Sequence, residues 1–469
     1  MHFSPEEENP NLPLSKFESM LRNNKVEFFD SEEFEEIILH YLDQGKATLA
    51  KRALKLALKQ HPGSTGLQLV HAEILIYDDK VEQADLILNK LLAVEPFNEE
   101  IYIQKANIYS KKDQHDKAIE QLKVAAQYTE DPADVYSLMG MEYLFLDELE
   151  EAKRCFKICL EEDLEDQTAL YNIVYCYEFL NQVEDAILFL ESYINQNPYS
   201  EIAWHQQGRL LYDLKKYEEA LTAFDFAYMI DEFFTGAMVE KGKCLEKLKR
   251  FDEAILCYLN SLELEDASSY VLLRLGKCYE KISNKAKAIE YYSKTVHEDP
   301  LLDKGWVAIT DFYLRQEDYN KALYFINKAL AIDNENLQYW KRFARIHYLL
   351  ENWEDAVYGF EKSITYGETH VESWLLLVDT LIALQENEKV TQVLLDAVEV
   401  FPKQTDILAR LSGWMFWNHQ TEKGIYYLVE LLQEETEALA IFEEMFPEVY
   451  TSEMVQNTII QFFQNKLMN

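Results

Sequence analysis

Apolar residues recur along the chain with a fixed period of 34 residues. Alanine marks the period ten times in succession, with no residue inserted or deleted between the copies: Ala50, Ala84, Ala118, Ala152, Ala186, Ala220, Ala254, Ala288, Ala322 and Ala356. A period of this size is typical of a motif that cannot bury its apolar face alone and must stack on its neighbours. The sequence therefore predicts a stack of repeats without a single central core.

Within one period, the apolar residues fall where two amphipathic helices require them. In blocks of 34 residues that begin at Ser31, they occupy the fourth, seventh, eighth and eleventh places, and then the twentieth, twenty-fourth and twenty-seventh. These intervals of three and four residues place side chains on one face of a helix. Each block is therefore predicted to be a helical hairpin, and twelve tandem blocks fit into residues 31–438.

Small residues stand at two places of most blocks. Glycine or alanine occupies the eighth place, for example Gly208, Gly242 and Gly276, and alanine occupies the twentieth. We expect these two places to face each other, so that the two helices of a hairpin pack closely. A larger side chain there is expected to cost about 1 to 3 kcal/mol through overpacking.

The two ends of the chain depart from the period. Residues 1–13 are acidic and contain Pro5, Pro10 and Pro13, which predicts a mobile tail, and residues 14–24 predict a short helix. The tail and helix together make up residues 1–30. Asp30 and Glu33 have the spacing of a capping box at the start of the first repeat helix. Residues 439–469 are predicted to form capping helices that cover the last repeat.

Composition narrows the range of partners and compartments. The chain has 45 Lys and Arg against 84 Asp and Glu, a formal net charge of −39, so its overall field repels nucleic acid and anionic membranes. A hydrophobic fraction of 48% is too high for a disordered acidic chain. No secretory signal and no membrane span are predicted. We expect a folded, cytoplasmic protein whose six cysteines are reduced; its oligomeric state stays open.

No motif in the sequence predicts catalysis or a cofactor. The patterns HExxH, GxxxxGK[ST], GxGxxG and GxSxG do not occur. Cys155 and Cys159 are one helical turn apart, but Cys159 occupies the core-facing twenty-seventh place, so we interpret both as core residues. The ten histidines show no spacing typical of a metal-ligand set. We therefore expect no enzyme activity, no metal and no cofactor.

The repeat resembles that of the tetratricopeptide repeat (TPR) family, whose signature is W-x2-L-G-x2-Y, then A-x3-F, then P. The clearest copies are Leu272-x2-Leu275-Gly276-x2-Tyr279 with Ala288-x3-Tyr292 and Pro300, and Trp204-x3-Gly208 with Ala220-x3-Phe224. The resemblance covers residues 31 to about 438. It implies an all-α fold, a right-handed superhelical solenoid of about twelve helix-turn-helix repeats.

The resemblance also implies that the first helix of each repeat lines an inner, concave surface. Basic residues occur at or near its ligand-facing places in the sixth to tenth blocks: Arg209, Lys243, Arg274, Lys277, Lys341, Arg342 and Arg345. One interpretation is a basic strip that binds an acidic, extended peptide. The alternative is internal pairing, because Glu246 and Glu280 follow two of the lysines by three residues.

Nearer the N-terminus, the same places carry apolar residues. They are Met141 and Phe145 in the fourth block and Tyr171, Tyr175 and Phe179 in the fifth. One interpretation is that these side chains anchor a partner, since aromatic residues dominate the energy of many interfaces. The alternative is that they pack between adjacent first helices.

These observations favour a protein that acts by binding. The leading prediction is an adaptor or scaffold that holds a protein or peptide segment in the concave groove. One alternative is a structural subunit of a larger assembly, in which Trp414, Phe416 and Trp417 make permanent contacts. Another is a regulatory partner of a separately encoded enzyme.

Overall fold

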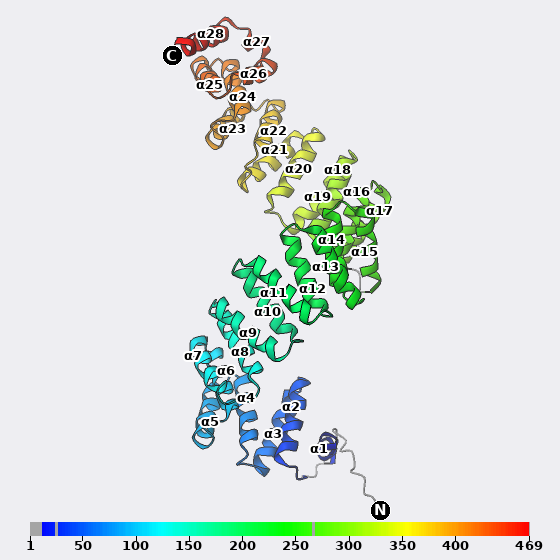
Figure 1. Cartoon of the computed structure of the whole chain (residues 1–469). Coiled ribbons are helices and arrows are strands. Elements are labelled where there is room, and N and C mark those ends of the chain that lie inside the picture. Colours follow the sequence, from blue (N-terminus) through cyan, green and yellow to red (C-terminus); the bar gives the residue numbers. More distant parts are fainter. Residues whose placement is uncertain (1–11, 24–26, 265–267, 469) are drawn as a thin grey trace, which may run out of the picture. The chain divides into compact units, whose positions relative to one another are not determined.

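The structure is a computed structural model that describes residues 12–23, 27–264 and 268–468. The chain divides into two compact units, Met1–Glu240 and Lys241–Asn469, which we call the N-terminal and C-terminal units. In the residues that the structure describes there are 28 α-helices, one 3-10 turn and no strand (Figure 1). Most of the acidic tail predicted for residues 1–13 lies outside the described residues.

Twelve helical hairpins follow one another at the predicted interval in the described part of the chain, so the all-α repeat fold is confirmed. The first helices are α2 (Ser31–Asp43), α4 (Thr65–Tyr77), α6 (Glu99–Lys111), α8 (Pro132–Phe145), α10 (Gln167–Phe179), α12 (Glu201–Asp213), α14 (Thr235–Lys247), α16 (Ser269–Lys281), α18 (Asp303–Arg315), α20 (Leu337–Leu349), α22 (Val371–Ala383) and α24 (Thr405–Trp417). The second helices are α3 (Ala47–Gln60), α5 (Val81–Val94), α7 (His115–Ala125), α9 (Leu149–Glu162), α11 (Val183–Gln196), α13 (Tyr217–Ile230), α15 (Phe251–Leu264), α17 (Lys285–Glu298), α19 (Tyr319–Ile332), α21 (Trp353–Thr365), α23 (Asn387–Val400) and α25 (Thr421–Glu434).

One further helix precedes the first hairpin. Helix α1 (Leu12–Asn23) buries Phe17 against the rings of Phe29 and Phe34, with centroids 5.8 and 6.3 Å apart. The predicted capping box is confirmed, because the backbone N–H of Asp30 donates to Oε2 of Glu33 at 2.8 Å and the N-cap side chain accepts in return. The capping box therefore satisfies the backbone N–H groups of Asp30 and Glu33 at the start of the first repeat helix.

Four elements follow the last hairpin, namely η1 (Thr436–Ala438), α26 (Leu439–Met445), α27 (Pro447–Tyr450) and α28 (Glu453–Met468). Phe442 and Val455 of these elements are fully buried in one cluster with Leu428 and Leu431 of α25. A Cβ atom at Gly413 of α24 would collide with the ring of Phe446. The terminal helices therefore cover apolar surface that a following repeat would otherwise bury.

The alanines at the twentieth place are all fully buried in the structure. We predicted that the eighth place faces the alanine of the twentieth place. In the structure, a glycine at the eighth place faces an aromatic ring of the second helix instead. A Cβ atom at Gly208 would lie 2.7 Å from the ring of Phe224, and one at Gly242 would lie 2.5 Å from the ring of Tyr258. These rings stand at the twenty-fourth place. The glycine is needed because an aromatic ring of the second helix lies directly on the backbone of the first.

Each first helix from α4 onward also buries the third and tenth places of its block, which the periodicity did not single out. Ile101, Val135 and Ile407 stand at the third place, and Ile108 and Cys176 at the tenth, and all are buried. A first helix packs against its hairpin partner and also against the neighbouring repeats. It therefore has a wider buried stripe than an isolated hairpin requires.

Every hairpin turns through a left-handed residue at its fifteenth place. In the described residues these are Gly45, Asp79, Asp113, Asp147, Asn181, Lys215, Lys249, Ser283, Glu317, Glu351, Gln385 and His419, with φ between 54° and 68°. The residue that follows bonds back into the first helix, for example from the N–H of Lys80 to the carbonyl of Leu75 at 2.8 Å. This geometry ends the first helix in a way that usually uses glycine, yet glycine occupies the place only once.

Candidate functional site

Exposed apolar side chains cluster on the first helices of the N-terminal unit, a surface that we call the first-helix face. On α10, Tyr171 and Tyr175 are each 42% exposed and Phe179 is 62% exposed. On α8, Met141 is 40% and Phe145 is 63% exposed. Residues four apart share a helix face, and the rings of Tyr175 and Phe179 lie 4.3 Å apart. Packing covers part of each of these side chains, and 40 to 63% of their surface stays open to solvent.

Part of this cluster lines a pocket of about 510 Å³, which we call the aromatic pocket. Its lining residues are Tyr171, Asn172, Tyr175, Glu178 and Phe179 of α10, and Gln206 and Arg209 of α12. Arg209 donates to both carboxylate oxygens of Glu178, at 3.0 and 2.5 Å, and to Oε1 of Gln206 at 3.1 Å. The charge of Arg209 is thus neutralised from the preceding repeat, which leaves the rings as the main binding feature of the pocket.

The exposed ring of Phe145 on α8 has a fixed neighbour. It stacks on the imidazole of His115, with centroids 4.9 Å apart, and Nδ1 of His115 lies 2.7 Å from Oε2 of Glu142. These contacts hold one side of Phe145 in place while the rest of the ring stays open to solvent.

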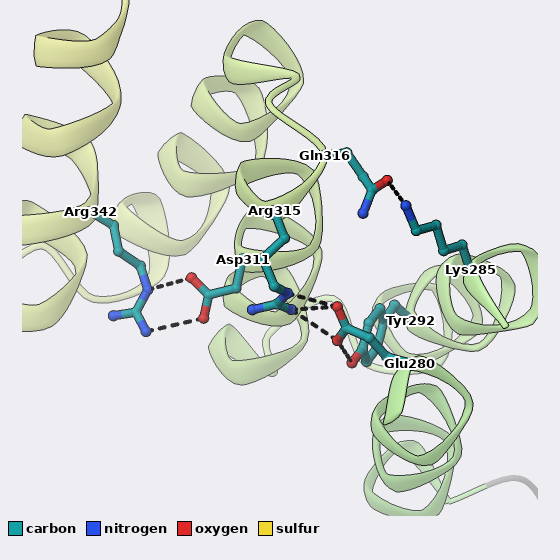
Figure 2. Close-up of polar contacts among 7 residues, drawn as sticks. All are labelled: Glu280, Lys285, Tyr292, Asp311, Arg315, Gln316 and Arg342. Atoms are coloured by element: carbon teal, nitrogen blue, oxygen red, sulfur yellow. Dashed lines mark hydrogen bonds and ion pairs between the residues drawn. The ribbon is translucent and has the colours of Figure 1, made fainter. Parts of the chain in front are cut away.

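In the C-terminal unit, arginines on the first helices bind carboxylates of the preceding repeat. Figure 2 shows two such pairs that meet at α18. Arg315 donates to Glu280 of α16 at 2.8 and 2.9 Å, and Arg342 of α20 donates to Asp311 at 2.8 and 3.1 Å. Arg410 of α24 donates to Asp379 of α22 through a single guanidinium nitrogen. Bidentate pairs like those of Arg315 and Arg342 fix the orientation of the guanidinium group.

Buried tyrosines hold two of these carboxylates in position. The hydroxyl of Tyr292 donates to Glu280 at 2.9 Å (Figure 2), and that of Tyr258 donates to Glu246 at 2.6 Å. Burial, reinforced by the charge of Glu246, raises the pKa of Tyr258 far above its usual range, so the phenol stays a donor. Glu246 then binds Arg274 at 3.1 Å. Each carboxylate therefore joins a tyrosine of its own hairpin to an arginine of the next.

A second kind of pair involves Lys341 on α20. Its Nζ lies 3.0 Å from Oε2 of Glu368, whose side chain is fully buried in the turn before α22. Glu368 also accepts from the backbone N–H of His370 at 2.7 Å and from the hydroxyl of Ser373 at 3.1 Å. Burial opposes ionisation, but the backbone and side-chain hydrogen bonds with His370 and the pairing with Lys341 hold the pKa of Glu368 at about 2.

Four of the seven residues of the predicted basic strip are therefore paired with carboxylates of this chain. Internal pairing accounts for Arg209, Arg274, Lys341 and Arg342, although their partners lie in other repeats and not three residues away on the same helix. Glu280 binds Arg315 and not Lys277, the partner expected for it. Lys277 and Arg345 are exposed and form no ion pair among the described residues, and Lys243 is half-buried on α14.

A second pocket, of about 570 Å³, lies beside Arg345 in the C-terminal unit. Its charged lining residues are Asp311, Arg315, Glu317, Lys341, Arg342, Arg345 and Glu372. Most of these charges are already paired with one another or with Glu280 and Glu368. Arg345 is therefore the cation in this pocket with capacity to bind a ligand.

Sequence reasoning missed Glu178 and Gln206, two polar residues that line the aromatic pocket. Glu178 could have been found from its position in the repeat. It stands at the twelfth place of its block, as Glu246 and Glu280 do, and each of the three binds an arginine of the next block. A comparison of twelfth places with the arginines of the next block therefore identifies the pairs of Arg209, Arg274 and Arg315, whereas Arg342 and Arg410 pair with carboxylates at the ninth place, Asp311 and Asp379.

Five of the six cysteines are buried, and Cys257 is partly exposed. Cys155 and Cys159 are buried, and burial raises the pKa of their thiols to about 12 and about 11. Protonated, buried thiols are poor nucleophiles, so the interpretation of both as core residues is confirmed. No group of three or more His, Cys, Asp and Glu side chains within the described ranges could hold a metal ion. None of the helices over those ranges is long and apolar enough to span a bilayer.

Comparison with known proteins identifies the repeat. Three family models, each described as a tetratricopeptide repeat, match residues 168–200 and 270–301, residues 205–269, and residues 99–131 and 133–166. No protein with a curated description gives a sequence match.

Solved structures with related folds are distant in sequence. The Cut9-Hcn1 hetero-tetramer of the APC/C is 13% identical, with 85% of this chain and 92% of that chain covered and a TM-score of 0.38. The C-terminal part of a TPR repeat-containing protein from Cytophaga hutchinsonii is 16% identical, with 58% and 98% covered and a TM-score of 0.38. YrrB, described as a TPR protein with an unusual peptide-binding site, is 17% identical, with 39% and 95% covered and a TM-score of 0.33.

Proposed function

We propose that this chain, a member of the tetratricopeptide repeat family, is an interaction scaffold that holds an extended segment of another protein on the first-helix face of its N-terminal unit. Repeat proteins bind partners through such continuous surfaces. The observation that carries the proposal is the row of exposed rings at Tyr171, Tyr175 and Phe179 beside the aromatic pocket.

The spacing of these rings suits an extended ligand. Residues four apart on a helix are about 6 Å apart along its axis, and alternate side chains of an extended chain are about 6.6 Å apart. The rings of Tyr175 and Phe179 lie 4.3 Å apart and form one anchor. Tyr171, one helical turn before Tyr175, can meet the next alternate side chain of the same bound segment. Aromatic anchors of this kind are commonly worth about 2 kcal/mol or more each when an interface buries them.

The charge of the pocket favours an apolar ligand over an acidic one. Arg209 is engaged with Glu178, so a carboxylate of the ligand would have to displace an existing ion pair. An acidic segment would instead be held in the C-terminal unit, where Lys277 and Arg345 are exposed without an ion pair within the described residues. The proposed ligand of the aromatic pocket therefore carries two or three bulky apolar side chains.

The test is affinity purification from the native cell with identification of partners by mass spectrometry. We expect the variant Tyr171→Ala, Tyr175→Ala, Phe179→Ala to keep its helical circular dichroism, because all three side chains are partly exposed, and to lose its partners. The matched control is Leu86→Ala, Tyr199→Ala, Phe233→Ala, which removes three apolar side chains that are 64, 80 and 67% exposed elsewhere in the same unit. This control should retain the partners.

A second arm of the experiment uses the variant Lys277→Glu, Arg345→Glu. Loss of a partner only in this variant, and in wild type at high salt, would identify an acidic ligand and would reject the apolar one. Retention of the same stoichiometric partners by all variants would favour the structural-subunit alternative. For that alternative, Trp417 offers an exposed surface at 53%, whereas Trp414 is buried and Phe416 packs against the core.

A further inference from the structure

The second helices of the N-terminal unit border a groove that the proposed function does not use. Two pockets, of about 350 and 620 Å³, adjoin between α9 and α11 and share Lys157 and Phe189. The first has four apolar lining residues, Leu160, Leu164, Phe189 and Tyr193, beside Lys157, Glu161, Ser192 and Gln196. The second is lined mainly by charged residues, namely Glu150, Lys153, Arg154, Lys157 and Asp185. We call the two together the outer groove. It has an apolar half and a charged half, with Lys157 at the junction.

Lys157 lacks a carboxylate partner in the described part of the chain. Its Nζ donates to the hydroxyl of Tyr177 at 2.8 Å and lies 5.1 and 5.4 Å from the ring centroids of Tyr177 and Phe189. Lys153, one turn earlier, is neutralised by Glu150 at 2.9 Å. An ammonium group has three N–H donors, so Lys157 keeps a positive charge and donors available to a ligand. This is notable in a chain with a net charge of −39, where carboxylates are abundant.

The apolar half of the groove is formed without a ligand. Leu160 and Tyr193 are buried in its floor, and the hydroxyl of Tyr193 donates to the carbonyl of Leu164 at 2.5 Å. The side chain of Leu164 is 42% exposed, and that of Leu188, which lines the charged half, is 62% exposed. A bulky apolar side chain can enter here and cover surface that is now exposed to water.

We propose that the outer groove binds a protein segment in which a carboxylate side chain stands two residues from a bulky apolar side chain. The carboxylate pairs with Lys157, and the apolar side chain enters the half lined by Leu164 and Phe189. Residues two apart in an extended segment point to the same side and are about 6.6 Å apart, which suits two adjoining pockets that share a wall. This site is independent of the aromatic pocket, which lies on the first helices.

The experiment is selection of a random dodecapeptide display library on the full-length protein, followed by titration of the selected synthetic peptides. We expect peptides with the pattern Asp or Glu, any residue, then Leu, Ile, Phe or Trp. Their affinity should fall about tenfold or more in Lys157→Met, which removes a charge-assisted hydrogen bond but keeps an unbranched apolar side chain that is one atom shorter. Leu188→Glu, at an exposed position, should also weaken binding because its carboxylate competes for Lys157.

Two variants serve as controls. Arg154→Met removes a cation of the same pocket that is already paired with Glu151 at 2.6 Å, and it should change affinity less than about threefold. The variant Tyr171→Ala, Tyr175→Ala, Phe179→Ala should bind these peptides as wild type does, so failure of the proposed function leaves this result unaffected. Circular dichroism and thermal midpoints establish that each variant is folded.

Three outcomes would overturn the proposal. The first is a library that yields no peptide sensitive to Lys157→Met. The second is a selected set that is sensitive to this change but carries no acidic residue. The third is binding of palmitate, tested as a separate probe, that depends on Lys157 while no peptide binds, which would assign the groove to a fatty acid.

Discussion

At the scale of single residues, the glycine of the eighth place is fixed by one contact. A Cβ atom at Gly208 would lie 2.7 Å from the fully buried ring of Phe224. We expect Gly208→Val to lower the free energy of unfolding by about 2 kcal/mol, because overpacking in a core costs about 1 to 3 kcal/mol and outweighs the gain in helix propensity. Urea denaturation of the full chain measures this change.

The control for this prediction is Gly63→Val in the same unit, since a Cβ atom at Gly63 has no neighbour within 4 Å. It should change the free energy of unfolding by less than about 0.5 kcal/mol. Equal effects of the two substitutions would show that the ring of Phe224 moves aside, and the steric account of the eighth place would then be wrong.

Glu368 predicts a dependence of stability on pH. Its pKa in the folded chain is about 2, below the ordinary value of 4.5. The ionised carboxylate therefore stabilises the folded chain above about pH 4.5, and this contribution is lost as the pH falls towards 2. We expect Glu368→Gln to lower the free energy of unfolding at pH 7 by up to about 3 kcal/mol, with a difference from wild type that shrinks on acidification.

Denaturant titrations at pH 7, 5, 4 and 3 measure this difference. Glu372→Gln, at an exposed position on the helix that follows, is the control and should leave the unfolding free energy unchanged at each pH. A difference between Glu368→Gln and wild type that stays constant over this range would contradict the assignment of the low pKa to Glu368.

At the scale of helices and turns, the left-handed fifteenth place offers a gain in stability. A non-glycine residue in this conformation costs about 1 kcal/mol, and Lys215 holds it with φ of 62°. We expect Lys215→Gly to raise the unfolding free energy by about 0.5 kcal/mol once the greater entropy of glycine in the unfolded chain is deducted. Lys216→Gly, at φ of −84°, should be neutral or destabilising.

Thermal denaturation of the two variants distinguishes these outcomes. If Lys215→Gly were as destabilising as Lys216→Gly, the side chain of Lys215 would contribute more than its backbone conformation costs. The same comparison can be repeated at Glu317 and Glu351, which have φ of 59°.

The helices could be predicted from the sequence because their signal is local. First helices begin at the first place of their blocks, apart from α8, which begins one residue earlier at Pro132. The ion pairs between first helices of successive repeats could not be predicted in this way. Arg274 and Glu246 are 28 residues apart, and Arg315 and Glu280 are 35 apart, so the pairing depends on how one repeat stacks on the next. The outer groove was missed because its cation, Lys157, belongs to a second helix.

At the scale of the whole molecule, charge opposes folding. A net charge of −39 generates self-repulsion that salt screens, because the Debye length falls from about 10 Å at 0.1 M to about 3 Å at 1 M. The ion pairs between repeats are weakened by the same salt, but such pairs contribute only about 0.2 to 1 kcal/mol each when partly exposed. We therefore expect the thermal midpoint of unfolding to rise between 0.1 and 1 M NaCl.

Differential scanning calorimetry at a series of salt concentrations measures this midpoint, and sodium chloride should be compared with an equal concentration of sucrose to exclude a general solute effect. A midpoint that falls with salt would mean that the ion pairs between repeats outweigh the repulsion across the whole chain.

The recurrence of one turn geometry also bears on how a gene for such a chain can change in length. Asp147 and Asn181 have the same left-handed conformation and stand at the same place of consecutive hairpins. Recombination that joins the codon of one to the codon that follows the other deletes a complete hairpin, and the reciprocal event duplicates it. In either product, the new junction lies in a turn whose backbone conformation both original turns already have. Unequal crossing-over can therefore lengthen or shorten the array without a new loop.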